Sequence, residues 1–311
     1  MRDVQRNSGK VSVLGIFVAD AVFQTPRMPE MGETLLCRHF YMGPGGKGSN
    51  QAVASAHAGA DTCFITMLGN DAFASMAIEL YQRTGVTTFI EQSNEQPTGG
   101  AFVHVNEDSG ENAIVVAPGI ASAIDPDYVH KAAGVIQDAA VFLTQLEQPV
   151  EAVESALQLA QSSGVTTILN TAPAVPLTNS VFALCDYVTP NETEAEAYSG
   201  ISINTIEDAR RAADSILAKG VGTVVITMGG NGVLLHNQDC SKHIQAFPVQ
   251  HVVDTTGAGD AFNGAFAAAL SVGENAEYAA RFACAGAALS VTREGASNAM
   301  PLRSEILEFI G

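Results

Sequence analysis

The sequence predicts a doubly wound α/β fold, in which a mainly parallel β-sheet is flanked by helices and carries a small β-sheet lid. Two observations support this. Short runs rich in β-branched residues alternate with segments of helical spacing along most of the chain, as is typical of parallel sheets built from β-α-β units. Two other segments break the alternation and have the pattern of antiparallel strands. Apolar residues make up 47% of the 311 residues and charged residues only 15%, which indicates a well-packed globule.

The elements of the main sheet follow in order along the chain. Buried parallel strands are expected at 11–18, 62–67, 140–146, 165–169 and 223–227, each a short apolar run. Helices are expected between them at 51–58, 72–83, 150–161, 192–198 and 206–218. Gly59, Gly164 and Gly220 follow three of these helices, where a glycine commonly ends a helix.

Two segments in the first half of the chain are expected to form the lid. Residues 34–42 and 100–117 have strand patterns, the second with a turn at 106–112. We place the lid strands at about 21–43 and 99–118, over one edge of a single domain that spans 11–311. Residues 1–10 are a polar tail without the apolar segment of a signal peptide.

Charge and cysteine content restrict the partners. The net charge of −18 argues against nucleic acid or an anionic membrane as a partner, and no apolar run is long enough for a membrane span. An anionic substrate must therefore be received by helix N-termini, a metal ion or a few basic side chains. The five cysteines are odd in number and scattered, which fits reduced thiols in a cytoplasmic protein without disulfides or a zinc site.

The most informative segment is 254–264, which places a glycine-rich turn directly before a helix of small residues. The backbone N–H groups of Gly257, Ala258 and Gly259, together with the helix dipole, predict an anion-binding site. Asp260 lies in the first turn of this helix, and a base beside a phosphate cradle is what phosphoryl transfer to a hydroxyl requires. The alternative is a turn followed by an Asp that only complements the helix dipole.

A second glycine cluster lies at 43–51. Gly43, Gly45 and Gly48 match the dinucleotide-binding spacing GxGxxG, but that motif belongs after the first core strand, and this cluster follows a lid strand. A nicotinamide-dependent oxidoreductase therefore stays only a distant alternative. We interpret the cluster as a tight loop whose backbone approaches a small ligand, with Lys47 and Asn50 as donors.

Three segments resemble motifs of the PfkB (ribokinase-like) carbohydrate kinases. Residues 45–52 and 254–260 look like the two signatures of that family, and 190–196 resembles its metal-associated segment. The resemblance runs from Val11 to Pro301. It implies the predicted fold and lid, often with a homodimer formed through the lid, and an ATP-dependent kinase that phosphorylates the primary hydroxyl of a small sugar. Mg²⁺ and K⁺ are the implied ions, and ribose is the expected sugar. The alternatives are 2-deoxyribose or another pentose or polyol and, more distantly, a non-catalytic sugar-binding regulator.

The resemblance also assigns roles to individual residues. It implies that Asp260 is the general base and that Gly257, Ala258 and Gly259 form the anion hole. The sugar-contacting positions correspond to Asp20, Gly46, Lys47, Asn50, Glu147 and Asp260. The nucleotide-binding positions correspond to Asn191, Thr227, Met228, Gly229, Gly230, Asn231, Gly232, Gly259 and Cys284. Asn191 and Glu194 correspond to the water shell of Mg²⁺, and Asp254, Thr256, Ser290, Arg293 and Gly295 correspond to a monovalent-cation site.

Structural alternatives exist for several of these positions. Asn191 and Glu194 have the spacing of a capping box at a helix start. Glu147 before Pro149 could be a solvated loop carboxylate, Lys47 a surface lysine, and 227–232 a simple turn between strands.

Three positions depart from the pattern that the resemblance implies. Ribokinases usually carry Asn two residues before the substrate Asp, and this chain has Val18, which strengthens the case for a deoxy sugar. Ala299 replaces a hydroxyl residue of the cation site, and Cys284 stands where some members carry His near the adenine. Sugar preference, cation affinity and nucleotide preference are open at this point.

Overall fold

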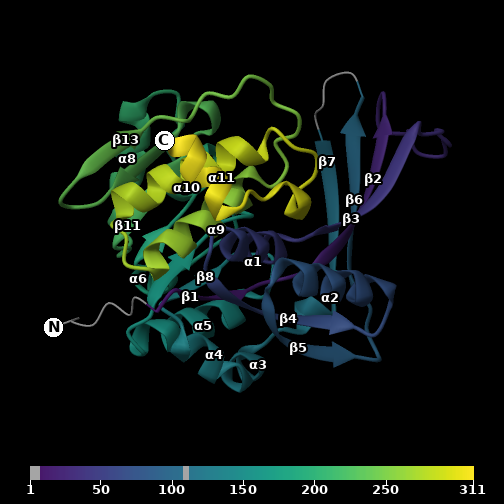
Figure 1. Ribbon diagram of the computed structural model, residues 1–311, viewed down its shortest axis with the longest axis horizontal. Coiled ribbons are helices and arrows are strands. Elements are labelled where there is room, and N and C mark those ends of the chain that lie inside the picture. The colour runs from purple at the N-terminus through teal and green to yellow at the C-terminus, as the bar shows by residue number, and fades with distance from the viewer. Residues whose placement is uncertain (1–7, 108–111) are drawn as a thin grey trace.

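The computed structural model describes residues 8–107 and 112–311, and the main sheet is the centre of the fold (Figure 1). Its nine strands have the order β13-β12-β11-β10-β9-β8-β1-β4-β5. In this order, every pair of adjacent strands from β11 through to β5 is parallel. β12 and β13 extend the sheet as an antiparallel hairpin next to β11. The strands are β1 (Lys10–Leu14), β4 (Asp61–Gly69), β5 (Thr87–Ser93), β8 (Val141–Thr144), β9 (Thr166–Leu169), β10 (Tyr187–Val188), β11 (Thr223–Thr227), β12 (Val233–His236) and β13 (Ser241–Ile244).

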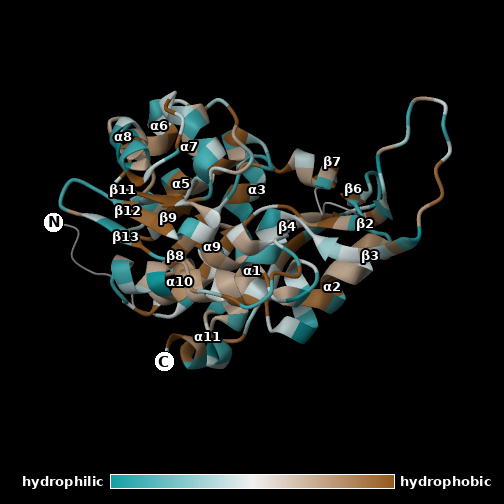
Figure 2. Cartoon of the chain, turned by 90° about the horizontal axis from the view of Figure 1, so that it is seen from above, coloured by the Kyte–Doolittle hydropathy of each residue, from teal (hydrophilic) through white to brown (hydrophobic). Residues whose placement is uncertain are grey.

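Helices cover both faces of this sheet, as the doubly wound prediction requires (Figure 2). One face is covered by α1 (Lys47–His57), α2 (Ala72–Thr84), α9 (Ala258–Ser271), α10 (Ala276–Ser290) and α11 (Arg303–Ile310). The other face is covered by α3 (Pro126–Lys131), α4 (Ala133–Asp138), α5 (Val150–Ser162), α6 (Asn179–Ala183), α7 (Glu192–Ser199) and α8 (Ile206–Leu217). Three short 3₁₀ helices lie at η1 (Ile120–Ala123), η2 (Gly229–Asn231) and η3 (Ser297–Ala299).

Strand side chains alternate between two separate hydrophobic cores. Leu143 of β8 packs with the first group of helices and its neighbour Phe142 with the second, and both are fully buried. This period of two, with both faces covered, explains why the parallel strands appear in the sequence as continuous apolar runs. In the described ranges, no helix is long and apolar enough to cross a membrane.

A separate small sheet projects from one side of the main body (Figure 1). Its strands β2 (Val18–Thr25), β3 (His39–Gly45), β6 (Thr98–Asn106) and β7 (Asn112–Gly119) have the order β3-β2-β6-β7. β3 and β7 pair antiparallel to their neighbours, whereas β2 and β6 are parallel to each other. Of the turn expected at 106–112, residues 108–111 lie outside the described residues, as do 1–7 of the expected tail.

The structure corrects three expected boundaries. The single strand expected at 11–18 is two strands, because β1 ends at Leu14 and the chain crosses into the small sheet at Val18. A Cβ at Gly15 would lie 2.7 Å from the Cα of Gly48, so the backbone there passes directly against the start of α1. Helix α1 begins at Lys47 and not at 51, and Gly46 precedes it with φ 89°. Residues 47–50 are therefore the first turn of this helix and not a loop. The strand expected at 34–42 begins only at His39.

Helices α1 and α9 approach each other closely at a glycine. A Cβ added to Gly264 would lie 2.5 Å from the Cβ of Ala54 and 2.6 Å from the carbonyl oxygen of Gln51. Only a residue without a side chain fits this contact. The approach brings the first turn of α1 beside the first turn of α9, where the residues of both glycine-rich segments lie.

We expect Gly264→Ala to lower the free energy of unfolding by about 1–3 kcal/mol, the usual cost of forcing an extra carbon into a packed core. Gly134→Ala is the matched control, because this glycine is also helical and a Cβ there would meet nothing within 4 Å. Urea unfolding of the two variants measures the difference. Equal stability of the two would show that α1 and α9 can separate without cost.

Candidate functional site

A polar cavity of about 190 Å³ lies where several parallel strands end. In α/β sheets of this kind, ligands bind outside the carboxyl ends of the strands. The walls come from the segments after β9 and β10, the last residue of β11, the loop before α9, and the N-termini of α1, α7 and α9. The lining residues are Lys47, Asn170, Ala172, Thr189, Asn191, Glu194, Thr227, Thr255, Gly257, Ala258, Gly259, Asp260 and Asn263.

The N-terminus of α9 opens into this cavity. Gly257 caps the helix with φ 76°, and a Cβ there would lie 2.9 Å from the Cβ of Ala296, so both the backbone angle and the space require glycine. The N–H of Ala258 donates to the carbonyl oxygen of Thr255 at 3.2 Å, because the turn closes on itself, and it is therefore not free as the sequence suggested. Within the described residues, the N–H groups of Gly257 and Gly259 have no protein acceptor, and they remain available to an anion.

Asp260 is buried in the first turn of α9 but lies in the cavity wall. Two side-chain amides of α1 hold its carboxylate: Asn50 Nδ2 donates to Oδ2 at 3.0 Å and Gln51 Nε2 donates to Oδ1 at 2.9 Å. Burial raises the pKa of Asp260, while the nearby charge of Lys47 and the two amides oppose that rise. The result is an oriented carboxylate with a strengthened affinity for a proton.

Lys47 lies among carboxylates at the start of α1. Its backbone N–H donates to Oε2 of Glu147 at 2.8 Å. Burial opposes the charge of Lys47, but Asp260, Glu147 and Glu194 more than compensate, and its pKa is raised overall. Burial also raises the pKa of Glu147 to about 7, against the influence of Lys47. Neither residue is the solvated surface group that the sequence left open as an alternative.

Asp20 reaches the same region from the small sheet. It lies in β2 opposite Gly43, and a Cβ on nearby Gly45 would collide with its carboxylate. Burial, with a smaller contribution from the charge of Asp260, raises its pKa to about 6. The small sheet therefore brings a carboxylate close enough for its pKa to respond to Asp260, although Asp20 is not among the residues that line the cavity.

Asn191 and Glu194 form the capping box that the sequence allowed. Glu194 N–H donates to Asn191 Oδ1 at 2.8 Å, and Asn191 N–H donates to Glu194 Oε2 at 3.0 Å. Both residues also line the cavity, so capping does not remove them from it. Burial raises the pKa of Glu194. A carboxylate and an amide oxygen facing a polar cavity fit a hydrated divalent cation, although no group of three or more His, Cys, Asp or Glu in the described ranges could hold a metal ion.

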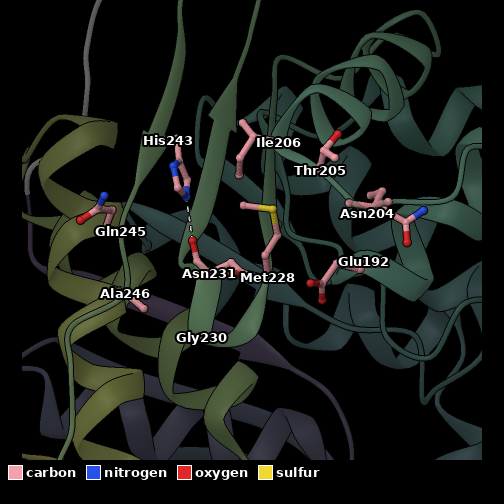
Figure 3. A pocket seen from close by; sticks show the side chains of 11 residues that line it. Glu192, Asn204, Thr205, Ile206, Met228, Gly230, Asn231, His243, Gln245 and Ala246 are labelled. Carbon is pink, nitrogen blue, oxygen red and sulfur yellow. Dashed lines mark hydrogen bonds between the residues drawn. The ribbon is translucent and has the colours of Figure 1, made fainter.

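The segment 227–232 connects the antiparallel strands β11 and β12 through the 3₁₀ turn η2. Thr227 lines the polar cavity, whereas Met228, Gly230 and Asn231 line a second cavity of about 420 Å³ (Figure 3). The Nε2–H of His243 donates to the carbonyl oxygen of Asn231 at 2.7 Å and ties the turn to β13.

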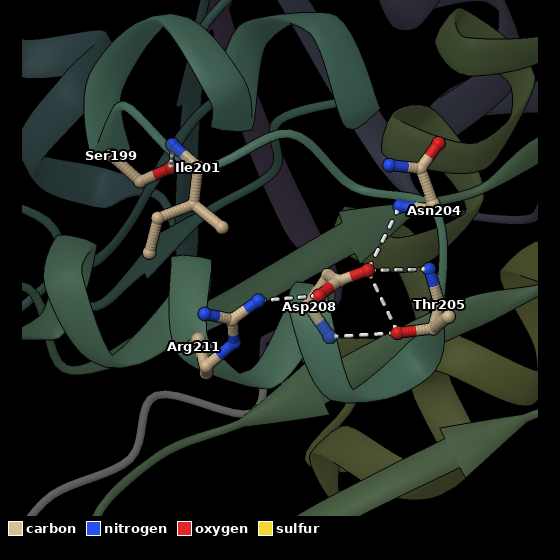
Figure 4. Close-up of polar contacts among 6 residues, drawn as sticks. All are labelled: Ser199, Ile201, Asn204, Thr205, Asp208 and Arg211. Atoms are coloured by element: carbon tan, nitrogen blue, oxygen red, sulfur yellow. Dashed lines mark hydrogen bonds and ion pairs between the residues drawn. The ribbon is translucent and has the colours of Figure 1, made fainter.

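The second cavity is also bounded by the start of α8. Thr205 and Asp208 form a capping box there, and Asp208 also accepts from the backbone N–H of Asn204 and pairs with Arg211 (Figure 4). These contacts hold Asn204 and Thr205 at the cavity rim, so this wall is set by the fold of α8 itself.

Three of the residues assigned to a monovalent cation lie together. Asp254 accepts the N–H of Thr256 at 2.8 Å and of Gly295 at 3.0 Å, which joins two loops beside the start of α9. The side chain of Arg293 pairs with Glu305 at 2.6 Å, and the Ser290 hydroxyl donates to the Ala287 carbonyl at 2.9 Å. The Arg293 side chain is a cation and can offer only its backbone oxygen, whereas Ser290 keeps hydroxyl lone pairs as well as its backbone oxygen. Cys284 is buried in α10, and burial raises its pKa to about 12.

Sequence reasoning assigned no role to several residues around Asp260. Asn170, Thr189 and Asn263 line the cavity, and Gln51 and Ser297 are buried behind it. Asn170 and Thr189 directly follow β9 and β10, and polar residues just after buried parallel strands are the signal that could have found them. Nothing local in the sequence distinguishes Ser297, whose hydroxyl donates to Asn50 Oδ1 at 2.5 Å.

Comparisons with known proteins extend over nearly the whole chain. The profile of the pfkB family carbohydrate kinases matches residues 8–303. A ribokinase from Haemophilus influenzae is 40% identical over 301 residues, which cover 96% of this chain and 98% of that protein. A deoxyribokinase from Salmonella typhi is 35% identical, with 96% and 98% covered. The structure of Arabidopsis thaliana ribokinase complexed with ribose and ATP superimposes with a TM-score of 0.91 at 31% identity, covering 97% and 98% of the two chains.

The raised pKa of Glu147 leads to a prediction about stability. Between its ordinary value of 4.5 and about 7, the folded protein keeps a proton that the unfolded chain has lost. The contribution of Glu147 to the free energy of unfolding is therefore fully present below pH 4.5 and is lost as the pH rises through about 7. We expect the melting temperature of the unmodified protein, relative to Glu147→Gln, to fall between pH 5 and pH 8.

Thermal unfolding at several pH values measures this difference. Glu151→Gln, in the exposed first turn of α5, is the control for a general effect of removing one acid. A difference between Glu147→Gln and the unmodified protein that does not vary with pH would contradict the assignment.

Proposed function

The chain belongs to the PfkB family of carbohydrate kinases, and we propose that it transfers the γ-phosphoryl group of ATP to the primary hydroxyl of ribose, giving ribose 5-phosphate and ADP. The observation that carries this proposal is the position of Asp260, a buried and doubly hydrogen-bonded carboxylate at the N-terminus of a helix that faces a polar cavity. The names of the relatives and the bound ribose and ATP of the Arabidopsis protein support the choice of substrates.

The nicotinamide-dependent alternative loses its support. Gly43 and Gly45 lie in β3 of the small sheet, and Gly48 lies in α1. A dinucleotide fingerprint requires its glycines after the first core strand, and membership in a kinase family leaves no role for that spacing.

In the proposed mechanism Asp260 accepts the proton of the sugar hydroxyl as its oxygen attacks the γ-phosphorus. A carboxylate with a raised pKa is suited to this step, because its pKa lies nearer to the pH at which the enzyme works. The free N–H groups of Gly257 and Gly259 and the dipole of α9 stabilise the charge on the transferred group. Ala258 contributes less than the resemblance implies, because its N–H donates to the carbonyl oxygen of Thr255.

The sugar is proposed to lie between the small sheet and the start of α1. Asp20 and Glu147 accept hydrogen bonds from hydroxyls, Lys47 and Asn50 donate them, and the backbone at Gly46 allows close approach. The side chain of Asn50 is already held by Ser297 and Asp260, so it presents its remaining N–H in a fixed direction. The small sheet then acts as a lid, since Asp20 belongs to it.

We place the nucleotide along both cavities, since Asn191 and Gly259 line the polar cavity and Met228, Gly230 and Asn231 line the second. ATP is proposed to contact Asn191, the segment 227–232, Gly259 and Cys284. Asn191 and Glu194 would hold Mg²⁺ through water, and the ion would neutralise phosphate charge. Asp254 with backbone oxygens of Thr256, Ser290, Arg293 and Gly295 would hold K⁺, more weakly than with a hydroxyl at position 299.

We further propose a cytoplasmic homodimer formed through the small sheet. Its outer strands expose apolar side chains on both faces of the sheet, which a monomer would leave to water. Phe40 and Met42 of β3 and Val115 of β7 lie on one face, and Tyr41 of β3 and Ile114 and Val116 of β7 lie on the other. The five cysteines are all free thiols, which fits a reducing compartment.

A second candidate substrate is 2-deoxyribose. Val18 is buried at the start of β2, on the same side of that strand as Asp20, and it offers no hydrogen bond to a sugar hydroxyl. A deoxyribokinase stands among the relatives at 35% identity. An unpaired 2-hydroxyl at this position would disfavour ribose.

Replacing the proposed base tests the mechanism. Asp260→Asn should retain the fold and ATP binding but lower kcat with ribose by at least about 10²-fold, the usual scale for losing a positioned base. Coupled ADP-release kinetics and calorimetric ATP titration measure the two properties, with exposed Asp239→Asn as the control. Activity within a few-fold of the unmodified enzyme would show that another group accepts the proton.

Substitution at Val18 tests the choice of sugar. Val18→Asn should raise kcat/KM for ribose relative to 2-deoxyribose by up to about 10²-fold, because one hydrogen bond to a hydroxyl is restored. If Val18→Asn disturbs the fold, the smaller change Val18→Thr is used for the same measurement. Val22→Asn on the same strand is the control. An unchanged ratio in both Val18 variants would mean that this side chain does not face the sugar.

A further inference from the structure

The carboxylate of Asp260 is held from two sides, and the two donors differ in their surroundings. Asn50 belongs to the proposed sugar site. Gln51 is fully buried and is absent from the cavity wall. Its Nε2 nevertheless lies 2.9 Å from Oδ1 of Asp260. Gln51 therefore contacts the proposed base from inside the protein and not from the cavity.

The orientation of the Gln51 amide is determined by its other contacts. Nε2 of Gln145 donates to Oε1 of Gln51 at 2.6 Å, which fixes the oxygen end of the amide. Nε2 of Gln51 also donates to Oδ1 of Asn170 at 3.0 Å, and Asn170 in turn donates from Nδ2 to the carbonyl oxygen of Thr189 at 2.9 Å. A rotated Gln51 amide would set oxygen against oxygen at two places.

These bonds join four parts of the fold at one carboxylate. Gln51 is in α1, Gln145 follows β8, Asn170 follows β9, and Asp260 is in α9. Gln145 also lies two residues before Glu147, one of the proposed sugar ligands. The buried amides thus connect the proposed base to the ends of the central strands.

We propose that Gln51 is a positioning residue, which orients the carboxylate of Asp260 for proton transfer without touching substrate. This proposal rests on the proposed function, in which Asp260 is the base. A fully buried donor with a single possible orientation restricts the rotation of the carboxylate, and the second oxygen is then presented to the cavity by Asn50. Such fixed contacts are what hold a catalytic group in its productive geometry.

The charged groups that face Asp260 define the expected effect of removing Gln51. Lys47 of α1 favours the ionised form, and the carboxylates in the same region are Asp20 of β2, Glu147 after β8 and Glu194 of α7, whose pKa values the charge of Asp260 raises. Burial opposes ionisation of Asp260, and Gln51 and Asn50 favour it. Loss of the Gln51 donor should therefore raise the pKa of Asp260 further.

Gln148 provides a matched control. It is another buried glutamine beside the site, but its Nε2 donates to Thr144 Oγ1 and to the carbonyl oxygen of Gln145 and does not reach Asp260. Gln148→Leu removes a buried amide of the same size. It reports any loss of activity that follows from weaker packing alone.

The experiment compares Gln51→Leu with Gln148→Leu in two measurements. The first is a ¹³C NMR titration of the Asp260 carboxyl in protein with labelled aspartate, assigned with Asp260→Asn, and it needs no activity. The second is the pH dependence of kcat with ribose. For Gln51→Leu we expect a higher pKa of Asp260, an acid limb of kcat displaced to higher pH, a kcat at neutral pH lowered about tenfold or more, and a sugar KM within about twofold.

Each outcome decides the proposal. Equal pKa values in Gln51→Leu and the unmodified protein, or the same shift in Gln148→Leu, would overturn it. If Gln51→Leu does not fold, Gln145→Leu removes the bond that fixes the Gln51 amide and should give a smaller shift in the same direction, and no shift there would also overturn it. If the unmodified protein phosphorylates no sugar, the proposed function fails, whereas the NMR titration still decides whether Gln51 controls Asp260.

Discussion

The close contact between α1 and α9 is the constraint on which the rest of the site depends. Gly264 lets the two helices approach until the first turn of α1 delivers two amides to Asp260, a residue more than 200 positions away in the chain. A buried carboxylate without such donors would be costly and would take up a proton. The contact therefore sets both the position of Asp260 and its affinity for a proton, and the N-terminus of α9 places it beside a natural site for an anion.

Electrostatics in this site depend on few positive charges. The protein carries a net charge of −18, and Lys47 stands among Asp20, Glu147, Glu194 and Asp260. Burial raises the pKa of Asp20 to about 6 and of Glu147 to about 7. Neutral donors, namely amides and free N–H groups at a helix start, supply the remaining stabilisation. This arrangement suits a neutral polyol beside a phosphoryl group, because hydroxyls need acceptors and the phosphoryl oxygens need donors.

The sequence predicted the fold class correctly because alternation of apolar runs and helical segments depends on local composition. It also predicted the segments that meet in the site, since glycine turns before helices have a local physical signature at Gly46 and Gly257. The sequence did not predict features that depend on contacts between distant parts of the chain. At the break between β1 and β2 the backbone of Gly15 passes against Gly48 in the first turn of α1, a contact between distant segments that no local pattern announces. Gln51 and Ser297 were missed because their role exists only through partners far along the chain.

The central claim is that Asp260 and the N-terminus of α9 serve phosphoryl transfer to a primary hydroxyl of a small sugar. It is tested most directly by measuring sugar-dependent ADP release across ribose, 2-deoxyribose, other pentoses, hexoses and nucleosides, with the phosphorylated position of each product assigned by NMR. The account predicts the highest kcat/KM for ribose or 2-deoxyribose and a product phosphorylated only on its primary hydroxyl. It would be contradicted if no sugar accelerated ADP release, or if the phosphate appeared on a ring hydroxyl.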